Sequence, residues 1–328
     1  MLKEKFLFEQ IPDRPFSHSA MIAQLSNGDL LSAFFAGQKE GIPDNAILTA
    51  RLKHGSKVWS DVQVVVDTLG KPNNNPVLFV NARGVISLFY MTIDGILGPE
   101  SCERTLMFAV KSTDGGHNWL PAQQVCTIQG WMLRNKPIHL KSGRILLPCY
   151  YENPFQWMGF CLYSDNEGET WKQSSWIKAP VDVIQPTLLE RKDGSILALF
   201  RSRSPADRPD QHRIWRSVSK DEGYTWSRCE PTNLPNPNSG IDLVGLRNGH
   251  VILAYNDSET ERTPLTLALS TDEGETWGKQ RHLETEPGHY SYPAIIQSQD
   301  ELIHVLYTWR NIRIKHVTVS EDWIGGAD

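Results

Sequence analysis

The chain has 328 residues, of which 40% are hydrophobic and 22% charged, which is the composition of an ordinary globular protein of two average domains or one large repeat architecture. Its net charge of −5 argues against bulk binding to nucleic acid or to an anionic membrane surface. The five cysteines are scattered without a CxxC pair, which favours reduced thiols over a disulfide framework or a zinc site.

Targeting and cofactor motifs are not found in the sequence. The first residues lack the apolar run of a signal peptide, and no stretch approaches the ~20 apolar residues of a membrane span. We therefore expect a cytoplasmic protein. The sequence also has no P-loop, no dinucleotide-binding glycine fingerprint and no H-E-x-x-H motif, so we expect neither a cofactor nor a metal.

Six pairs of short strands follow one another along the chain. Each pair is an apolar run rich in Val, Ile, Leu or Phe, a turn with Gly or Asp, and a second apolar run, which is the pattern of a β-hairpin. The pairs are residues 19–25 with 30–35, 76–80 with 85–90, 137–140 with 145–150, 186–189 with 196–200, 241–246 with 251–255, and 293–296 with 302–307. No convincing amphipathic helix interrupts this series.

A third run ends each of the six units at a tryptophan. These residues are Trp59, Trp119, Trp171, Trp226, Trp277 and Trp323. Four of them complete an eight-residue pattern, S-x-D-x-G-x-x-W, and in the second copy Asn166 occupies the Asp position. Asp and Gly favour a tight turn, and the tryptophan can cover the gap between neighbouring sheets. The first and last units carry degenerate copies.

Six units of four short strands predict an all-β protein, a six-bladed β-propeller formed as one domain over residues 1–328. In the first five units a segment after the tryptophan, such as residues 60–66, can supply the outer strand. The sixth unit has only residues 324–328, which are too few, whereas residues 2–11 have no other partner. We therefore expect the N-terminal strand to join the last blade and close the ring, because an open ring would leave bare strand edges.

The eight-residue pattern resembles the Asp box of the sialidase (BNR-repeat) superfamily. That resemblance extends over nearly the whole chain and implies a sialidase-like propeller. It also implies that the boxes are structural turns away from the substrate, so we expect no chemistry from their aspartates.

In such propellers the inner strands begin at one face of the central channel, where their first side chains converge. Counting back from each hairpin turn gives six polar or aromatic residues at these positions. They are His18, Asn75, Arg134, Gln185, Ser239 (or Asn238) and Tyr292. Polar residues at solvated strand ends would give the same pattern, so the ring alone does not establish a site.

The second strands return to the same face, and charged residues follow them. Glu40 and Asp44 follow the first pair, Arg201 the fourth and Arg310 the sixth, while Arg262 precedes a third strand. A single arginine of this kind is usually a surface salt bridge. Several arginines on one face of an acidic protein predict a small anionic ligand, such as a carboxylate-bearing sugar, because the guanidinium fork binds carboxylate with two parallel hydrogen bonds.

The resemblance implies roles for individual residues. Sialidases hold the substrate carboxylate with three arginines and use a tyrosine nucleophile that a glutamate assists. Arg201 and Arg262 match the second and third arginines. Tyr292 matches the nucleophile, with Tyr290 as the adjacent alternative.

Other family positions are ambiguous or substituted. Glu40 or Asp44 falls near the position of the acid/base aspartate. His18 stands where the family has its first arginine, and Gln185 where it has the assisting glutamate. Because glutamine cannot accept a proton, Tyr292 would lack a base, unless Glu152 or Asp94 supplies one.

Three functions remain open at this stage. The first is an exo-α-sialidase-type hydrolase acting on a terminal acidic sugar or oligosaccharide, in which Arg134 adds to the carboxylate-binding arginines. The second is a uronate lyase, whose base would be one of four residues. These are His18, His139, Tyr150 and Tyr292. The third is a non-catalytic carbohydrate-binding propeller, since the fold hosts many non-enzymes.

Overall fold

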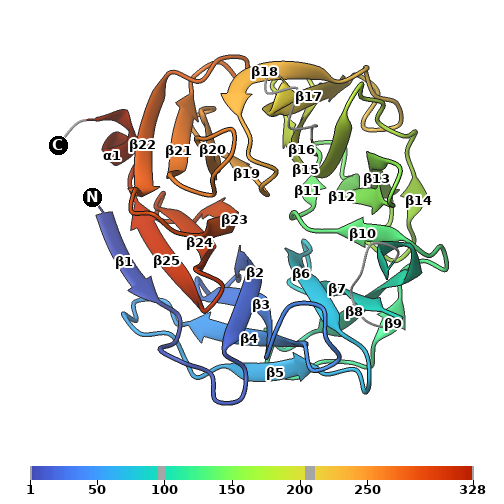
Figure 1. Cartoon of the computed structure of the whole chain (residues 1–328), viewed down its shortest axis with the longest axis vertical. Coiled ribbons are helices and arrows are strands. Elements are labelled where there is room, and N and C mark those ends of the chain that lie inside the picture. Colours follow the sequence, from blue (N-terminus) through green and yellow to red (C-terminus); the bar gives the residue numbers. More distant parts are fainter. Residues whose placement is uncertain (1, 95–100, 204–210, 327–328) are drawn as a thin grey trace.

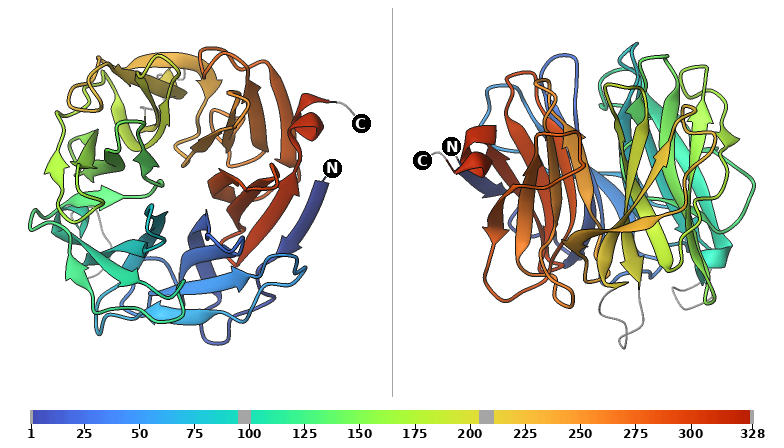
Figure 2. Two further views of the ribbon diagram at one scale, coloured as in Figure 1. Left: turned by 180° about the vertical axis from the view of Figure 1, so that it is seen from behind. Right: turned by 90° about the horizontal axis from the view of Figure 1, so that it is seen from above.

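Six antiparallel sheets stand around a central axis in the computed structural model, which describes residues 2–94, 101–203 and 211–326 (Figure 1). The strands run between the two faces of the resulting disc (Figure 2). The predicted six-bladed propeller is thereby confirmed.

Each blade is a meander whose strands lie in chain order from the axis outward, except that β1 supplies the outer strand of the last blade. The first three blades are β2 (Phe16–Gln24), β3 (Leu30–Gly37), β4 (Ala46–Leu52) and β5 (Gln63–Val66); then β6 (Asn73–Val80), β7 (Ile86–Ile93), β8 (Thr105–Ser112) and β9 (Gln123–Gln124); then β10 (Trp131–Leu133), β11 (Ile138–His139), β12 (Ile145–Glu152), β13 (Trp157–Ser164) and β14 (Lys172–Gln173).

The remaining blades repeat the pattern. They are β15 (Asp182–Glu190), β16 (Ile196–Arg203), β17 (Arg213–Ser219) and β18 (Glu230–Pro235); then β19 (Asp242–Gly245), β20 (Val251–Asn256), β21 (Leu265–Ser270) and β22 (Lys279–Glu284); then β23 (Tyr290–Gln297), β24 (Ile303–Trp309), β25 (Arg313–Val319) and β1 (Leu2–Phe6). A 3₁₀ turn, Ser101–Arg104, precedes β8.

The N-terminal strand closes the ring as predicted. β1 pairs antiparallel with β25, with Leu2 opposite Val319 and Phe6 opposite Lys315 (Figure 1). Side chains reinforce this pairing. The Glu4 carboxylate forms an ion pair with Lys315 Nζ at 2.7 Å. The Phe6 and Trp309 rings pack edge to face, with their centroids 5.3 Å apart.

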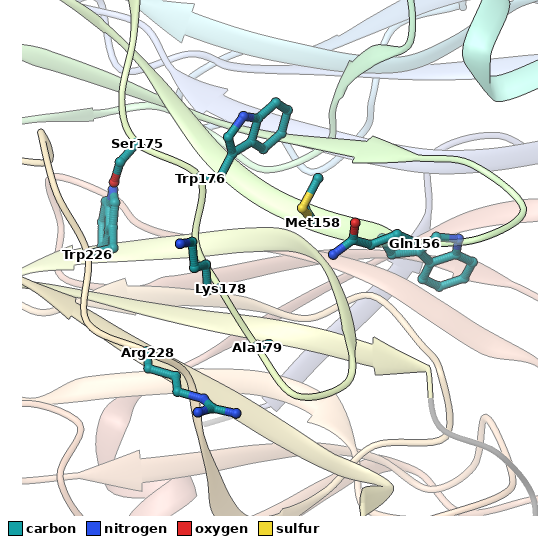
Figure 3. A pocket seen from close by; sticks show the side chains of 9 residues that line it. Gln156, Met158, Ser175, Trp176, Lys178, Ala179, Trp226 and Arg228 are labelled. Carbon is teal, nitrogen blue, oxygen red and sulfur yellow. The ribbon is translucent and has the colours of Figure 1, made fainter.

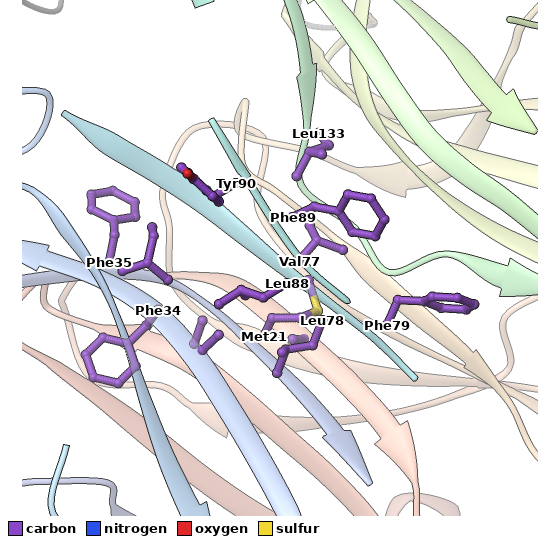
Figure 4. Close-up of a cluster of buried hydrophobic side chains, with 14 of the residues drawn as sticks. Met21, Phe34, Phe35, Val77, Leu78, Phe79, Leu88, Phe89, Tyr90 and Leu133 are labelled. Atoms are coloured by element: carbon purple, nitrogen blue, oxygen red, sulfur yellow. The ribbon is translucent and has the colours of Figure 1, made fainter. Parts of the chain in front are cut away.

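The hydrophobic core lies between the blades, where each sheet packs its face on the next. Met21 and Phe34 of the first blade, Leu88 and Phe89 of the second, and Leu133 of the third belong to one buried cluster (Figure 4). Such contacts remove large apolar side chains from water and so orient each blade against its neighbours.

The four complete boxes are hydrogen-bonded turns. In the last one, Ser270 Oγ donates to Asp272 Oδ1 at 2.7 Å, and the backbone N–H of Gly274 donates to Ser270 Oγ at 2.9 Å. The N–H of Thr276 then donates to Asp272 Oδ1 at 2.9 Å. Asn166 accepts the equivalent bonds in the second copy.

The inner strands begin earlier than the sequence predicts. β6, β15 and β23 start three or four residues before the predicted residues 76, 186 and 293, and each contains a bulge that leaves two residues unpaired. The second unpaired residue is a proline in all three strands. Because proline has no N–H for the ladder, it fits a bulge but resembles the start of a strand in the sequence.

One short helix departs from the all-strand expectation. Trp323, expected to end a strand unit, lies on α1 (Glu321–Gly325), which ends at Gly326 in the left-handed conformation. Across the described residues, the structure contains no helix with the length and apolar character needed to cross a membrane.

Candidate functional site

Backbone bulges at the start of the inner strands position the candidate site. Asn75, Gln185, Asn238 and Tyr292 all have positive φ, between 44° and 56°, although none is glycine. Residues with a Cβ pay a steric cost in this region, of the order of 1–3 kcal/mol each, so the surrounding structure must hold them there. The bulges mark the places where the predicted ring residues converge.

The Tyr292 hydroxyl is the centre of the cluster. Arg201 Nη1 lies 2.9 Å from Tyr292 Oη and also donates to Gln185 Oε1 at 3.1 Å. Gln185 Nε2 approaches the same hydroxyl at 3.4 Å. Arg201 Nε donates to Asn238 Oδ1 at 2.7 Å. The structure therefore brings together four residues that are far apart in the sequence.

Arg262 flanks the tyrosine from the fifth blade. Its Nη2 donates to the Asn238 carbonyl at 3.0 Å and its Nη1 to His289 Nε2 at 3.1 Å. The guanidinium carbon lies 5.9 Å from the centre of the Tyr292 ring. Burial, followed by the charge of Arg262, lowers the pKa of His289 to about 4, so His289 is neutral and can accept this bond at pH 7.

Arg134 is fully buried next to the Tyr292 ring, and its guanidinium group donates hydrogen bonds to backbone carbonyls. It donates to the carbonyls of Ile241 at 3.1 Å and Pro293 at 2.6 Å, and its guanidinium carbon lies 5.1 Å from the Tyr292 ring. Burial lowers its pKa to about 10, which leaves it charged at neutral pH. Its hydrogen bonds thus fix the fifth and sixth blades under Tyr292.

His18 lies against Tyr292, although its place in the strand differs from the prediction. It still pairs with Phe35 of β3, so Ser19, with φ of 54°, is the bulge residue equivalent to Gln185 and Tyr292. The His18 and Tyr292 ring centroids are 4.2 Å apart. Burial and the charge of Arg262 hold the pKa of His18 well below 6.5, so its ring is neutral at pH 7.

The two predicted acid/base candidates have different environments. Glu40 follows β3 in a surface loop, but neighbouring protein surrounds its carboxyl closely enough for desolvation to raise the pKa of that group, against the opposing pull of Arg262 and Arg201. Asp44 instead stabilises the same loop, because its Oδ2 accepts the N–H of Gln38 at 2.9 Å. The charges of Arg262 and Arg201 therefore act on the Glu40 carboxyl, whereas the Asp44 carboxyl is engaged with the backbone of the loop.

The two carboxylates considered as substitutes for the missing glutamate also differ. Glu152, at the end of β12, has its pKa raised by burial, while the charges of Arg201 and Arg203 oppose that shift. Asp94 is exposed and pairs with Lys71 at 3.4 Å. Only Glu152 therefore has electrostatic contact with the cluster around Tyr292.

Three further candidates contact residues other than Tyr292. Asn75 Nδ2 donates to Tyr150 Oη at 3.3 Å, and burial raises the pKa of that tyrosine, whose hydroxyl also meets Gln185. Arg310 is exposed and contacts Tyr290 Oη at 3.3 Å rather than Tyr292. His139, one of the four candidate bases of a lyase, is exposed and stacks on Phe79 at 4.8 Å, near the opposite end of its blade.

Three neighbours of the cluster were missed by the sequence analysis. His289 holds Arg262, and Trp157 lies under Arg201 with its ring 5.7 Å from the guanidinium carbon. Gly240 lies beside the ring, where a Cβ would be only 3.3 Å from Gln185 Oε1. His289 could have been found from the sequence, because it lies three residues before Tyr292. Nothing in the repeat pattern indicates Trp157 or Gly240.

Metal chemistry has no visible basis in this cluster. Residues 2–94, 101–203 and 211–326 contain no group of three or more His, Cys, Asp or Glu side chains arranged to hold an ion. Cys149, Cys161 and Cys229 are free and buried within the sheets.

Comparison with known proteins gives a consistent family assignment. A family model described as a BNR repeat-like domain matches residues 28–305. The chain is 26% identical to a sialidase of Micromonospora viridifaciens over 338 aligned residues, which cover 92% of this chain and 50% of that protein. The chain spans about half the length of the curated relatives it matches.

Solved structures share the propeller fold. A protein of unknown function from Dyadobacter fermentans superposes with a TM-score of 0.82 at 18% identity, covering 97% of this chain and 98% of that one. The NanB sialidase of Streptococcus pneumoniae superposes with a TM-score of 0.80 at 14% identity, covering 97% of this chain and 70% of that one.

Proposed function

The chain belongs to the BNR repeat-like domain family, and from that premise we propose that it is a sialidase-like glycoside hydrolase that releases a terminal carboxylate-bearing sugar. One observation carries the proposal. Arg201 of the fourth blade and Arg262 of the fifth converge on the hydroxyl and ring of Tyr292 in the sixth. The relatives named as sialidases support the same substrate class.

Substrate binding is the first step. The sugar carboxylate would lie against the guanidinium groups of Arg201 and Arg262, which offer charged donors in a largely buried setting. A tyrosine suits the adjacent position, because a carboxylate nucleophile would be repelled by the substrate's own charge. Because His18 stands where the family has its first arginine, two cations rather than three would hold the carboxylate.

Bond cleavage would follow on Tyr292. Its oxygen forms a bond to the anomeric carbon while the bond from that carbon to the leaving oxygen breaks, and Glu40 gives its proton to the leaving oxygen. Gln185 cannot take the tyrosine's proton, so the neutral imidazole of His18 is the candidate acceptor. Water then attacks the anomeric carbon as the bond from that carbon to the Tyr292 oxygen breaks. Glu40 accepts a proton from the water, and His18 returns to the Tyr292 oxygen the proton that it took in the first step.

The test is turnover of a fluorogenic N-acetylneuraminic acid glycoside. Tyr292→Phe should lower kcat by about 10²–10⁴-fold, the usual range for loss of a positioned proton-transfer or nucleophilic group. Tyr290→Phe is the matched control, because Tyr290 is also buried but bonds Arg310 instead. Equal turnover by wild type and Tyr292→Phe would refute the assignment. Binding without turnover would favour a carbohydrate-binding propeller.

A uronate lyase is the second candidate function. The observation that favours it is the neutral His18, whose Nδ1 is buried without a hydrogen-bond partner among the described residues. As a base it would remove the proton beside a carboxylate that Arg201 and Arg262 neutralise. The electron pair would form a C=C bond and expel the glycosidic oxygen. Oligogalacturonate should then yield a product that absorbs in the ultraviolet, and His18→Ala should abolish it.

A further inference from the structure

A groove runs between the third and fourth blades, outside the cluster around Tyr292. Its cavity volume is about 680 Å³ (Figure 3). The third blade supplies the start of β13 and residues 175–179, and the fourth supplies the segment between β17 and β18. Six of the lining residues matter for the argument: Trp157, Met158, Trp176, Lys178, Trp226 and Arg228.

Aromatic side chains give this groove flat walls. The Trp176 indole is held in place by an edge contact with Phe160 at 4.8 Å and another with Tyr151 at 6.2 Å. It remains partly exposed, as does Trp226 on the facing blade (Figure 3). An indole that is fixed before the ligand arrives loses little conformational entropy on binding, and its face matches the C–H face of a pyranose ring.

Two cations in the groove lack partners. Lys178 and Arg228 are exposed, and neither side chain has a hydrogen bond or ion pair with any of the described residues. Most surface arginines of this chain are paired, as Arg216 is with Glu230 and Glu275. Two free cations beside aromatic walls, in a protein of net charge −5, create a local field that attracts anions.

Trp157 connects the groove to the candidate site. It lines the groove, yet its ring also lies 5.7 Å from the guanidinium carbon of Arg201 and 3.9 Å from that of Arg203. Its backbone N–H donates to Asp182 Oδ1 at 3.0 Å, which fixes the start of β13 against β15. Trp157 itself is buried, so a chain whose terminal sugar contacts Arg201 would leave the site over the surface beside Trp157 and enter the groove.

We propose that this groove binds the following sugar units of an acidic oligosaccharide whose terminal unit occupies the site around Tyr292. The inference rests on the proposed function, because it takes that site as the place of the terminal sugar. Tryptophan faces would stack on the rings of the chain, while Lys178 and Arg228 would meet carboxylates along it. A neutral oligosaccharide would use the tryptophans alone.

Calorimetric titration can test this with four probes. They are N-acetylneuraminic acid, its α2,8-linked tetramer, galacturonic acid and its tetramer. For the acid that binds, the tetramer should bind about 10-fold more tightly than the monomer, a gain of about 1.4 kcal/mol. Lys178→Ala/Arg228→Ala and Trp176→Ala should each remove most of that gain and leave monomer affinity unchanged. Arg83→Ala/Lys53→Ala, which removes the same charge elsewhere, should preserve it.

The possible failures are distinct. Equal affinity for monomer and tetramer, or a gain that survives the groove variants, would overturn the groove assignment while leaving the terminal-sugar site intact. Absence of binding by all four probes would overturn both. Tetramer binding that needs Lys178 and Arg228, together with monomer binding that needs Arg262, is the result we expect. High salt should weaken the tetramer more than the monomer.

Discussion

The two ends of each blade follow different rules. At the box end, the same serine, aspartate and glycine positions recur, and their polar groups bond one another within each turn. At the bulge end, the residues with positive φ differ from blade to blade, whereas at the box end positive φ recurs at the same position of each copy, occupied by Gly115, Glu167, Glu222 and Glu273. In the boxes, Glu167 Oε2 and Trp226 Nε1 are buried polar atoms without partners among the described residues, but a larger number of such atoms lies at the bulge end. They include Ser17 Oγ, His18 Nδ1, Asn74 Oδ1, Arg134 Nε and Ser239 Oγ.

The pKa values of the carboxyl groups also differ between the two ends. Hydrogen bonds from the backbone and side chain of Asn118 hold the pKa of Asp114, in a box, well below its usual range. Desolvation raises the pKa of Glu40 at the other end. One carboxyl is thus stabilised as an anion and the other is favoured as an acid. Repetition accompanies stability in this fold, and departures from repetition indicate where a ligand would bind.

Removing residues 2–6 should have the largest effect on stability, because β1 is the outer strand of the last blade and supports both its box end and its bulge end. The sixth blade would lose β1 and expose the edge of β25, so we expect a loss of about 3 kcal/mol or more in the free energy of unfolding. Denaturant titration measures it. Lys3→Ala, which keeps the strand, is the control. Unchanged stability of the truncated chain would show that the β1–β25 pairing does not hold the ring closed.

Gln185→Glu tests whether a residue at the bulge end takes part in proton transfer. It restores a carboxylate within reach of Tyr292 Oη, and Arg201 Nη1, which already bonds Gln185 Oε1 at 3.1 Å, can compensate the new charge. Turnover of the fluorogenic sialoside should rise by about 10²-fold, the usual contribution of a general base. A fall in turnover with an unchanged melting temperature would argue against proton transfer at this position.

Asp272→Ala tests the box end. The turn loses its bonds from Ser270 and Thr276, so the free energy of unfolding should fall by about 1–2 kcal/mol. Turnover at a temperature well below the transition should not change. Asp165→Ala is the control, since Asp165 lies in a box but pairs with Arg144 instead of forming the turn. Equal losses in both variants would contradict the account of the turns.

The opposite pKa shifts predict two separate pH windows. Box aspartates have lowered pKa values, so their contribution to stability is present above about pH 4 and is lost as the pH falls through the folded pKa. Turnover needs protonated Glu40, so it should decline as the pH rises through that raised pKa, by about tenfold per unit beyond it. Glu40→Gln should remove this alkaline limb from the pH–rate profile.

Repetition explains which features the sequence predicts. The blade count follows from six tryptophan-terminated units, and the role of β1 follows from the missing outer strand of the last unit. Convergence of Tyr292, Gln185 and Arg201 could also be predicted, because inner and second strands meet at one face. Positions that count from a repeated element are therefore accessible from one sequence.

Other features depend on contacts that no repeat encodes. Proline is the second unpaired residue in the bulges of β6, β15 and β23, so the starts of those strands were placed too late. The bulge of β2 lies at Ser19 and Ala20 and has no proline, and there His18 was aligned one residue from the true equivalent, Ser19. Arg134 was expected to meet a ligand, but its hydrogen bonds go to carbonyls of other blades. Trp157 belongs to the site only because the third and fourth blades are neighbours in space.

The most direct test of the contrast between the two ends is calorimetric binding of N-acetylneuraminic acid to three proteins: wild type, Arg262→Ala and Asp272→Ala, each with its melting temperature. The account predicts that Arg262→Ala abolishes binding and leaves the melting temperature within a degree or so, since within residues 2–94, 101–203 and 211–326 its side chain bonds only His289 and the Asn238 carbonyl. Asp272→Ala should lower the melting temperature and bind normally. Wild-type affinity in Arg262→Ala, or weakened binding in Asp272→Ala, would contradict it.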